Sequence, residues 1–219
     1  MNIKKAIALS GLVAATAGIS PLAFAQDTGW YIGGAVGQSE ADINRGELAA
    51  DLTAAGLTNT GFTADEKDTG WKLFGGYKFN KYFAVEGAYV DLGKFSASTT
   101  VTAVGGVPIA PLGVRASVET KDGLYISAVG IWPVTDKFSV FGKLGVYSIK
   151  TTLNVSVAGI SLNQSDRNED VTFGVGVGYD FTKNFGVRGE WERFNKVGNK
   201  DKTTEGDVDL LSVGLVYKF

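Results

Sequence analysis

The stretch VTFGVGVGYDF, residues 171–181, separates two kinds of side chain along one extended segment. Every odd position carries a valine or an aromatic residue, and the even positions carry Thr172, three glycines and Asp180. Successive side chains of a β-strand point to opposite faces, so one face of this strand is apolar and the other is small or polar. The glycine face cannot build an apolar core, and the apolar face therefore needs an apolar environment on its own side.

Seven further segments show the same period of two, which favours strands over helices. They are residues 29–38, 69–79, 83–92, 123–134, 137–150, 185–194 and 211–219. In 29–38 we place Trp30, Ile32 and Val36 on the apolar face, whereas both faces of 123–134 are apolar and its inside and outside stay unassigned. The sequence therefore predicts an all-β protein with eight strands.

The connections between these strands alternate in length. Short links lie near 80–81, 134–136 and 182–184, and long links lie near 40–67, 96–118, 152–168 and 196–206. The long links are rich in Gly, Thr, Asn, Asp and Ala, which is typical of surface loops. Segment 97–117 is unusually apolar. We expect it to extend its strands as a hairpin, with protein or lipid contact as the alternative.

An apolar band about ten residues long, opposite a glycine-rich face, has the length and polarity of a tilted transmembrane strand. Lipid offers no hydrogen bonds, so a sheet in the membrane must close on itself. We predict an eight-stranded antiparallel up-and-down transmembrane β-barrel over 26–219, with short periplasmic turns and long extracellular loops. A soluble secreted barrel of the lipocalin type is the alternative, and it requires the opposite facing of the strands.

The composition limits the chemistry of the chain. No Cys and no His occur among its 219 residues, which removes the usual ligands of zinc and iron–sulfur sites and the Ser-His-Asp and Cys-His catalytic arrangements. We expect no enzyme, no cofactor and no metal site. A formal net charge of −2 gives no reason to expect nucleic acid as a partner.

Residues 1–25 have the pattern of a cleaved secretory signal peptide. Lys4 and Lys5 precede an apolar run, and Ala23-Phe24-Ala25 forms a small-residue cleavage site before Gln26. The apolar run is shorter than the roughly 20 residues of a spanning helix. We therefore expect an exported protein whose mature chain is the barrel domain.

Aromatic residues gather where the predicted strands meet the short turns. Tyr-x-Phe pairs end three strands, a Trp-Pro pair ends a fourth, and phenylalanine opens the strand after each short turn. Tyr and Trp favour the boundary between lipid and water. We predict a periplasmic aromatic girdle made of Tyr77, Phe79, Phe83, Trp132, Phe138, Tyr179, Phe181, Phe185 and Tyr217.

Six charged residues fall on the small, inward faces of the strands: Lys72, Glu86, Lys143, Arg188, Glu190 and Glu192. Counting residues from the periplasmic turns brings opposite charges together at three levels, Glu86 with Arg188, Lys143 with Glu190, and Lys72 with Glu192. Unpaired charges in a narrow, partly desolvated lumen are costly. We hypothesise a ladder of salt bridges that plugs the barrel.

The stretches DTGWYIGGAVGQS (27–39), GWKLFGGYKFNKYFAVEGAY (70–89) and VRGEWERF (187–194), with a terminal aromatic residue, resemble the OmpA-like transmembrane barrel family over essentially all of 27–219. The resemblance implies a barrel in the outer membrane of a Gram-negative envelope and a Phe219 that the outer-membrane assembly machinery recognises. It also implies that lumen pairs can exchange and open a small pore. Many members continue into a periplasmic peptidoglycan-binding domain, which we do not expect here.

We therefore expect an integral outer-membrane protein, monomeric in outer-membrane lipid, with a structural or small-pore, porin-like role. The alternative is a surface protein that uses extracellular loops such as 41–67 and 97–117 for adhesion or recognition. An outer-membrane enzyme is disfavoured, because without His the common hydrolytic arrangements cannot form.

Overall fold

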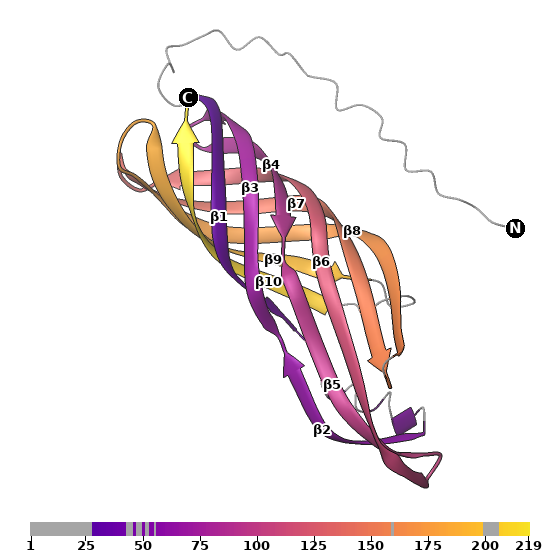
Figure 1. Ribbon diagram of the computed structural model, residues 1–219. Helices are drawn as coiled ribbons and strands as arrows, with labels where there is room; N and C mark the ends of the chain where they lie inside the picture. Colours follow the sequence, from indigo (N-terminus) through magenta and orange to yellow (C-terminus); the bar gives the residue numbers. More distant parts are fainter. Residues whose placement is uncertain are drawn as a thin grey trace, which may run out of the picture.

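The computed structural model describes residues 28–42, 46, 50, 53, 54, 56–158, 160–198 and 206–219, and nearly all of them lie in long, tilted strands (Figure 1). The strands are β1 (Gly29–Ala41), β2 (Leu57–Asp65), β3 (Lys67–Asn80), β4 (Phe83–Asp91), β5 (Gly93–Val104), β6 (Val107–Pro133), β7 (Phe138–Val157), β8 (Ile160–Asp180), β9 (Phe185–Val197) and β10 (Gly206–Lys218). No helix among the described residues is long and apolar enough to cross a membrane. The predicted signal peptide lies outside the described residues.

Eight of these strands form a closed ring. The order β6–β4–β3–β1–β10–β9–β8–β7 is antiparallel throughout, and the pairing of β6 with β7 returns the sheet to its start. The pairing of β1 with β10, from Tyr31↔Lys218 to Ala41↔Val208, joins the first and last strands. Each strand of the ring therefore has a hydrogen-bonded neighbour on both sides, which is the arrangement that lipid requires.

The prediction of eight spanning strands is confirmed, and two further strands lie beside the ring. β5 continues the course of β4 beyond Leu92, where Gly93 has a φ of 85° that glycine adopts readily. β2 pairs with β5 and lies at the edge of the sheet. Part of the predicted loop 40–67 is thus a strand.

On one side of the barrel the strands run on as two long hairpins, β5–β6 and β7–β8, away from the end where the C-terminus lies (Figure 1). The expected hairpin over 97–117 is confirmed, and it turns at Gly105 and Gly106, whose φ values are 57° and 79°. The predicted loop at 152–168 was wrong, because β7 continues to Val157 and β8 begins at Ile160. Its polar residues alternate with valines and leucines, which is a pattern that paired strands tolerate well.

The facing of the strands is that of a membrane barrel. Outward Val175 and Leu215 are 56% and 68% exposed, and inward Lys72 and Glu86 are 1% and 0% exposed. The soluble lipocalin-type alternative requires the opposite facing and is contradicted.

The facing of the two difficult strands is also determined. Trp30, Ile32 and Val36 of β1 point outward, as predicted. In β6, whose two faces could not be assigned, Leu124 points outward and Tyr125 points into the lumen. Both faces of this strand looked apolar because two of its inward side chains, Tyr125 and Val129, are themselves aromatic or aliphatic.

Glycines on the inward face make room for aromatic rings. Gly33 is paired with Phe74, and Gly176 is paired with Phe141. A Cβ added to Gly33 would lie 2.3 Å from the Phe74 ring, and one added to Gly176 would lie 2.4 Å from the Phe141 ring. These glycines therefore form the wall against which two lumen rings pack.

The polarity of the two faces inverts where the strands leave the ring. Within the ring, the outward residues Leu144 and Val146 of β7 are 65% and 57% exposed. From Ser148 onward the outward face is polar and includes Asn154, while apolar side chains such as Val155 are on the inward face. A surface facing lipid is apolar and one facing water is polar, so this inversion marks the outer boundary of the membrane near Ser148.

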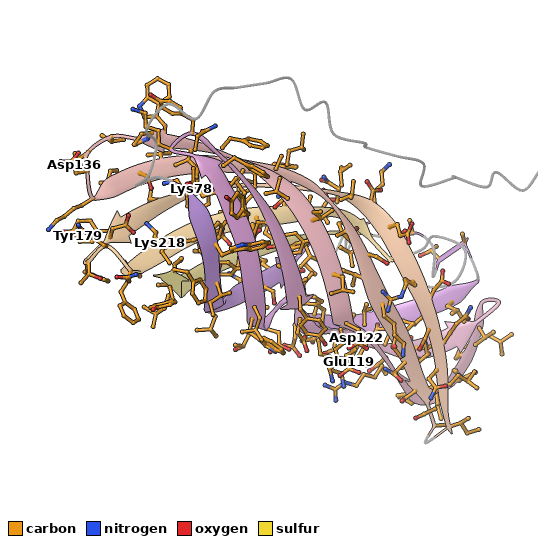
Figure 2. The ribbon with its side chains drawn as sticks, turned by 90° about the horizontal axis from the view of Figure 1, so that it is seen from above. Lys78, Glu119, Asp122, Asp136, Tyr179 and Lys218 are labelled. Atoms are coloured by element: carbon orange, nitrogen blue, oxygen red, sulfur yellow. The ribbon has the colours of Figure 1, made fainter. Side chains whose placement is uncertain are left out.

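The predicted girdle residues lie at the end of the barrel that carries the short turns. Most are strongly exposed, with Trp132 at 75%, and Figure 2 shows Tyr179 at that end close to Lys218 and Asp136. Edge-to-face and stacked contacts link most of them to each other and to two residues outside the predicted girdle, Trp30 and Phe219, in the series Trp30–Tyr77–Phe79–Phe83, Tyr179–Phe181 and Phe185–Tyr217–Phe219. A second set that the sequence analysis missed, Trp71–Tyr89 and Phe173–Trp191, lies toward the other boundary.

We expect Gly176→Ala to destabilise the barrel by about 1–3 kcal/mol, because the new methyl would overlap the Phe141 ring and the Gly189 carbonyl oxygen, 2.6 Å away. Gly189→Ala on the same sheet is the control, since its methyl would point outward with its nearest neighbour 4.0 Å away. Urea unfolding in lipid vesicles gives both values. Equal effects of the two substitutions would show that the lumen is not tightly packed.

Candidate functional site: the charged lumen

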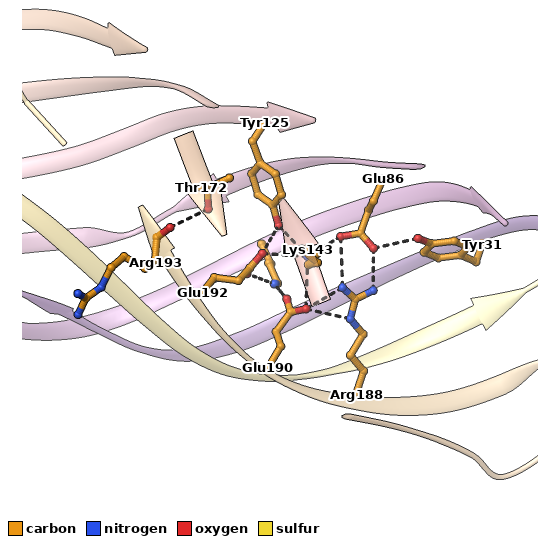
Figure 3. Close-up of polar contacts among 10 residues, drawn as sticks. Tyr31, Glu86, Tyr125, Lys143, Thr172, Arg188, Glu190, Glu192 and Arg193 are labelled. Carbon is orange, nitrogen blue, oxygen red and sulfur yellow. Dashed lines mark hydrogen bonds and ion pairs between the residues drawn. The ribbon is translucent and has the colours of Figure 1, made fainter. Parts of the chain in front are cut away.

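Six buried charges lie in the middle of the barrel (Figure 3). β3 supplies Lys72, β4 supplies Glu86, β7 supplies Lys143, and β9 supplies Arg188, Glu190 and Glu192 at alternate positions of one strand. None of the six is more than 8% exposed. The structure thus brings together all six inward charges singled out in the sequence.

Arg188 and Glu86 form the part of the network that lies nearest the short turns. Arg188 Nη1 donates to Glu86 Oε2 at 2.7 Å, across the lumen from β9 to β4. Its Nε and Nη2 donate to Glu190 Oε2 at 3.1 and 2.7 Å. One guanidinium therefore holds two carboxylates, and a fork of this kind fixes their geometry as well as their charge.

The two lysines join this pair to the remaining carboxylates. Lys143 Nζ lies 2.7 Å from Glu86 Oε1, 3.3 Å from Glu190 Oε2 and 2.9 Å from Glu192 Oε1. Lys72 contacts both Glu190 and Glu192. The three levels inferred from the sequence are thus connected into one network, because each long lysine side chain reaches carboxylates at more than one height.

Aromatic side chains hold the network in place. The Arg188 guanidinium lies between two rings, 4.4 Å from the Phe74 centroid and 4.6 Å from the Phe141 centroid. Such stacking suits the flat, weakly hydrated guanidinium. The Tyr31 hydroxyl donates to Glu86 Oε2 at 3.1 Å, and the Tyr125 hydroxyl donates to Glu192 Oε1 at 2.9 Å.

These aromatic partners were missed in the sequence analysis, although some signals were present. Phe74 falls on the inward face of its strand, and Tyr31 lies between two outward residues. Tyr125 sits in the strand whose two faces could not be separated. What the sequence lacked was the cross-strand register, which brings a ring of one strand next to a charge of another.

An apolar layer fills the lumen on the extracellular side of the charges. Phe194 is 0% exposed, and its ring contacts Tyr125 and Tyr147 edge to face at 5.8 and 5.6 Å between centroids. The layer is completed by the buried side chains of Val90, Leu92, Phe95, Ile149, Val197, Val208 and Leu210. The lumen is therefore also filled on the extracellular side of the ionic network, as an eight-stranded barrel allows.

The described residues contain no group of three or more His, Cys, Asp or Glu side chains placed to hold a metal ion. Each lumen carboxylate instead has a cationic partner at ion-pair distance. The arrangement is therefore a network of ion pairs in which one cation contacts several carboxylates.

A closed, outward-apolar ring with an ionic lumen defines an integral β-barrel of the outer-membrane type. The family model of the OmpA-like transmembrane domain matches residues 25–219. The chain belongs to this family and is an outer-membrane β-barrel protein of the cell outer membrane. By the rule for such barrels, the short turns are periplasmic and the long hairpins extracellular.

Relatives of known sequence support the same assignment. Outer membrane protein A of Klebsiella pneumoniae is 24% identical over 197 residues, covering 89% of this chain and 52% of the relative. Outer membrane protein A of Shigella flexneri is 27% identical over 224 residues, covering 99% of this chain and 56% of the relative. The chain thus spans about half the length of these relatives, which are named as membrane proteins and not as enzymes.

Solved structures similar to the chain include two surface proteins. Ail, the attachment invasion locus protein of Yersinia pestis, has a TM-score of 0.45 at 15% identity, covering 87% of this chain and 99% of that chain. Neisserial surface protein A has a TM-score of 0.46 at 15% identity, covering 87% and 97%.

We expect Arg188→Ala to cost about 3–5 kcal/mol, because it leaves Glu86 buried with less compensation. The double variant Arg188→Ala/Glu86→Ala should cost less than the sum of the two single changes, by about 1–3 kcal/mol. The exposed pair Lys67–Glu40, at 3.2 Å, is the control and should show a coupling below about 1 kcal/mol. Unfolding free energies of the four-variant cycles provide the measurement, and additive losses at Arg188 and Glu86 would mean that they do not act as a pair.

Proposed function

We propose that the protein is a structural, non-catalytic barrel of the outer membrane whose lumen is closed at rest. The observation that carries this proposal is the neutral balance of the lumen, where three cations meet three carboxylates. No net charge is left to attract a permeating ion, and no carboxylate or cation of the set is left without a partner. Such a network stabilises one closed arrangement of the side chains.

The apolar layer adds a second barrier in series with the charges. An ion that passed the network would still meet Tyr147 and Phe194, which are 3% and 0% exposed. Opening a pore therefore requires both layers to rearrange, so exchange of ion pairs alone is not sufficient. This argues for a plug over the gate that the family resemblance implied.

Planar-bilayer recordings of the refolded chain test this proposal. We expect no discrete openings from the wild-type protein, and none from Arg188→Ala, since the apolar layer remains. Wild-type openings whose size or frequency changes in Arg188→Ala would contradict the closed lumen and identify a gated pore. Protease protection of the membrane-spanning strands in the same membranes establishes that a silent protein is inserted.

Surface recognition is a second candidate role, and the exposed apolar residues of the hairpin tips favour it. Val107 of β6 is 65% exposed, and Ile160 and Leu162 of β8 are 70% and 71% exposed. These residues lie beyond the polarity inversion and so face water. We propose that they add a contact surface to the structural role of the barrel.

We also propose that the barrel is a monomer and that the outer-membrane assembly machinery recognises Phe219. The ring closes within one chain through β1 and β10. The Phe219 side chain is 70% exposed, packs only edge to face on Tyr217 at 5.1 Å among the described rings, and is available to a partner.

We expect Phe219→Ala to lower the assembled fraction in cells several-fold while leaving the stability of the assembled barrel within about 1 kcal/mol of wild type. Phe181→Ala is the matched control, because Phe181 is 56% exposed and packs in the same manner on Tyr179. The heat-induced shift in electrophoretic mobility measures the folded fraction. Equal assembly defects in the two variants would refute a specific role for Phe219.

A further inference from the structure

One arginine lies in the middle of the polar outward face of the sheet above the membrane. Beyond the membrane boundary, β2, β5, β6, β7 and β8 continue as a sheet of neighbouring strands (Figure 1). Their pairing places one residue of each strand in a row across the outward face: Thr63, Ser98, Arg115, Ser156 and Ser161. We call these residues the hydroxyl row. A single guanidinium is thus flanked by hydroxyl side chains on both sides.

The Arg115 side chain is exposed, and it has no ion-pair partner within the described part of the chain. The outward carboxylates of neighbouring positions are engaged elsewhere. Asp65 lies on β2, two strands away, and accepts a hydrogen bond from the Ser96 hydroxyl at 3.2 Å. Glu119 of β6 lies 2.7 Å from Lys121. The N–H donors of the Arg115 guanidinium are therefore available to an acceptor from outside the chain.

A depression with a volume of about 380 Å³ surrounds this arginine. Its lining includes Arg115, Ser98, Thr100, Ser156, Gly61 and Gly113. A Cβ added to Gly61 or to Gly113 would have no neighbour within 4 Å, so both glycines leave open space where another residue would place a side chain. A depression of this size accepts a small ligand such as a sugar ring.

The charge and shape of the lining limit the class of ligand. One arginine supplies one positive charge, and Asp65 on the same face disfavours an anion with several negative charges. The planar guanidinium fits a carboxylate through two parallel hydrogen bonds. The hydroxyl groups of Ser98 and Ser156 each donate and accept hydrogen bonds, as the hydroxyl groups of a sugar do. The depression therefore suits one carboxylate on a body rich in hydroxyl groups.

The height of the depression separates it from the membrane lipid. Ser156, which is paired with Arg115, lies eight residues beyond the membrane boundary at Ser148. This is about 26 Å along the strand, and less along the membrane normal because the strands are tilted. A soluble or surface-attached glycan reaches a position at this height, whereas a lipid headgroup does not.

We propose that the depression around Arg115 binds a sugar that carries one carboxylate, such as a uronic acid residue of an acidic polysaccharide. Arg115 pairs with the carboxylate. The hydroxyl groups of Ser98, Thr100 and Ser156 bind the hydroxyl groups of the sugar ring, and Gly61 and Gly113 leave the space that the ring occupies.

The test uses the isotope-labelled, refolded chain in lipid nanodiscs, with methyl glucuronide as the probe and the NMR shift of the Ser156 amide as the measure of affinity. Arg115→Gln should lower the affinity at least about tenfold, because it removes a charge-assisted contact of two hydrogen bonds. Gly113→Val should also lower it several-fold, because the new side chain fills the depression while Arg115 stays in place.

Arg167→Gln is the matched control. It removes the same charge from an exposed position of β8, where Arg167 Nη1 donates to the Ser148 hydroxyl at 3.3 Å. Salt screens a charge that lies beyond about 10 Å, so this variant should change the affinity less than about twofold. The electrophoretic shift on heating verifies that each variant is folded.

Two further ligands test the chemical class. Methyl glucoside lacks the carboxylate and acetate lacks the hydroxyl groups, so both should bind at least about tenfold more weakly than methyl glucuronide. The proposal is overturned by the absence of a saturable shift in the wild-type protein, by equal losses in Arg115→Gln and Arg167→Gln, or by an unchanged affinity in Gly113→Val. Binding of methyl glucoside or acetate as tight as that of methyl glucuronide, or tighter binding of glucose sulfate, also contradicts it.

This inference is separate from the proposed closed lumen and from the apolar hairpin tips. The substitutions leave the lumen charges and the exposed Val107, Ile160 and Leu162 unchanged. A failure of sugar binding therefore leaves the conductance test of the proposed function unaffected, and open channels in that test would leave the sugar site unaffected.

Discussion

The requirement that every backbone hydrogen bond be made inside the membrane determines the rest of this structure. Each strand that crosses lipid needs a partner on both sides, and the pairing of β1 with β10 meets that need for the first and last strands. With eight strands the ring is narrow, and side chains fill its interior. The glycines, the lumen charges and the apolar layer are consequences of this width.

A narrow lumen also explains why charge and bulk are distributed unevenly around the ring. Phe74 and Phe141 occupy space that Gly33 and Gly176 leave free, and together the rings sandwich the Arg188 guanidinium. Buried charges without partners would be costly, so the cations and carboxylates come in equal number and share contacts. The barrel thus presents an apolar face to lipid on the outside, while the charged side chains inside are paired with one another.

In the extracellular hairpins, the outward face of the sheet meets water instead of lipid. Above the membrane, the outward face of the sheet becomes polar because it meets water, and the apolar residues change to the inward face. Apolar and polar side chains therefore alternate along the strands both in the membrane and in the hairpins. Which face of the sheet is apolar depends on whether lipid or water surrounds the sheet at that height.

Much of the fold could be predicted from alternation alone, because an outward position such as Val175 and an inward one such as Glu86 differ in chemistry. The set of lumen charges followed from the same argument. The network that joins them could not be predicted. Lys72 contacts carboxylates of two levels and Lys143 contacts carboxylates of all three, and the length of a lysine side chain does not specify which carboxylates it contacts. Tyr125 was missed because its strand carries apolar or aromatic residues on both faces. The β7–β8 hairpin was mistaken for a loop because its polar residues resemble those of surface turns.

The central claim is that the ion-pair network and the apolar layer together close the lumen, and a single cysteine tests it most directly because the chain has none of its own. Ser127 lies in the lumen, is 3% exposed, and its hydroxyl has no hydrogen-bond partner among the described residues, so Ser127→Cys removes no contact. The account predicts that a water-soluble thiol reagent modifies this cysteine at least about a hundredfold more slowly than Ser161→Cys on the exposed face of β8, on the scale of roughly 3 kcal/mol for opening a packed interior. Modification of the two cysteines at similar rates would contradict a closed lumen.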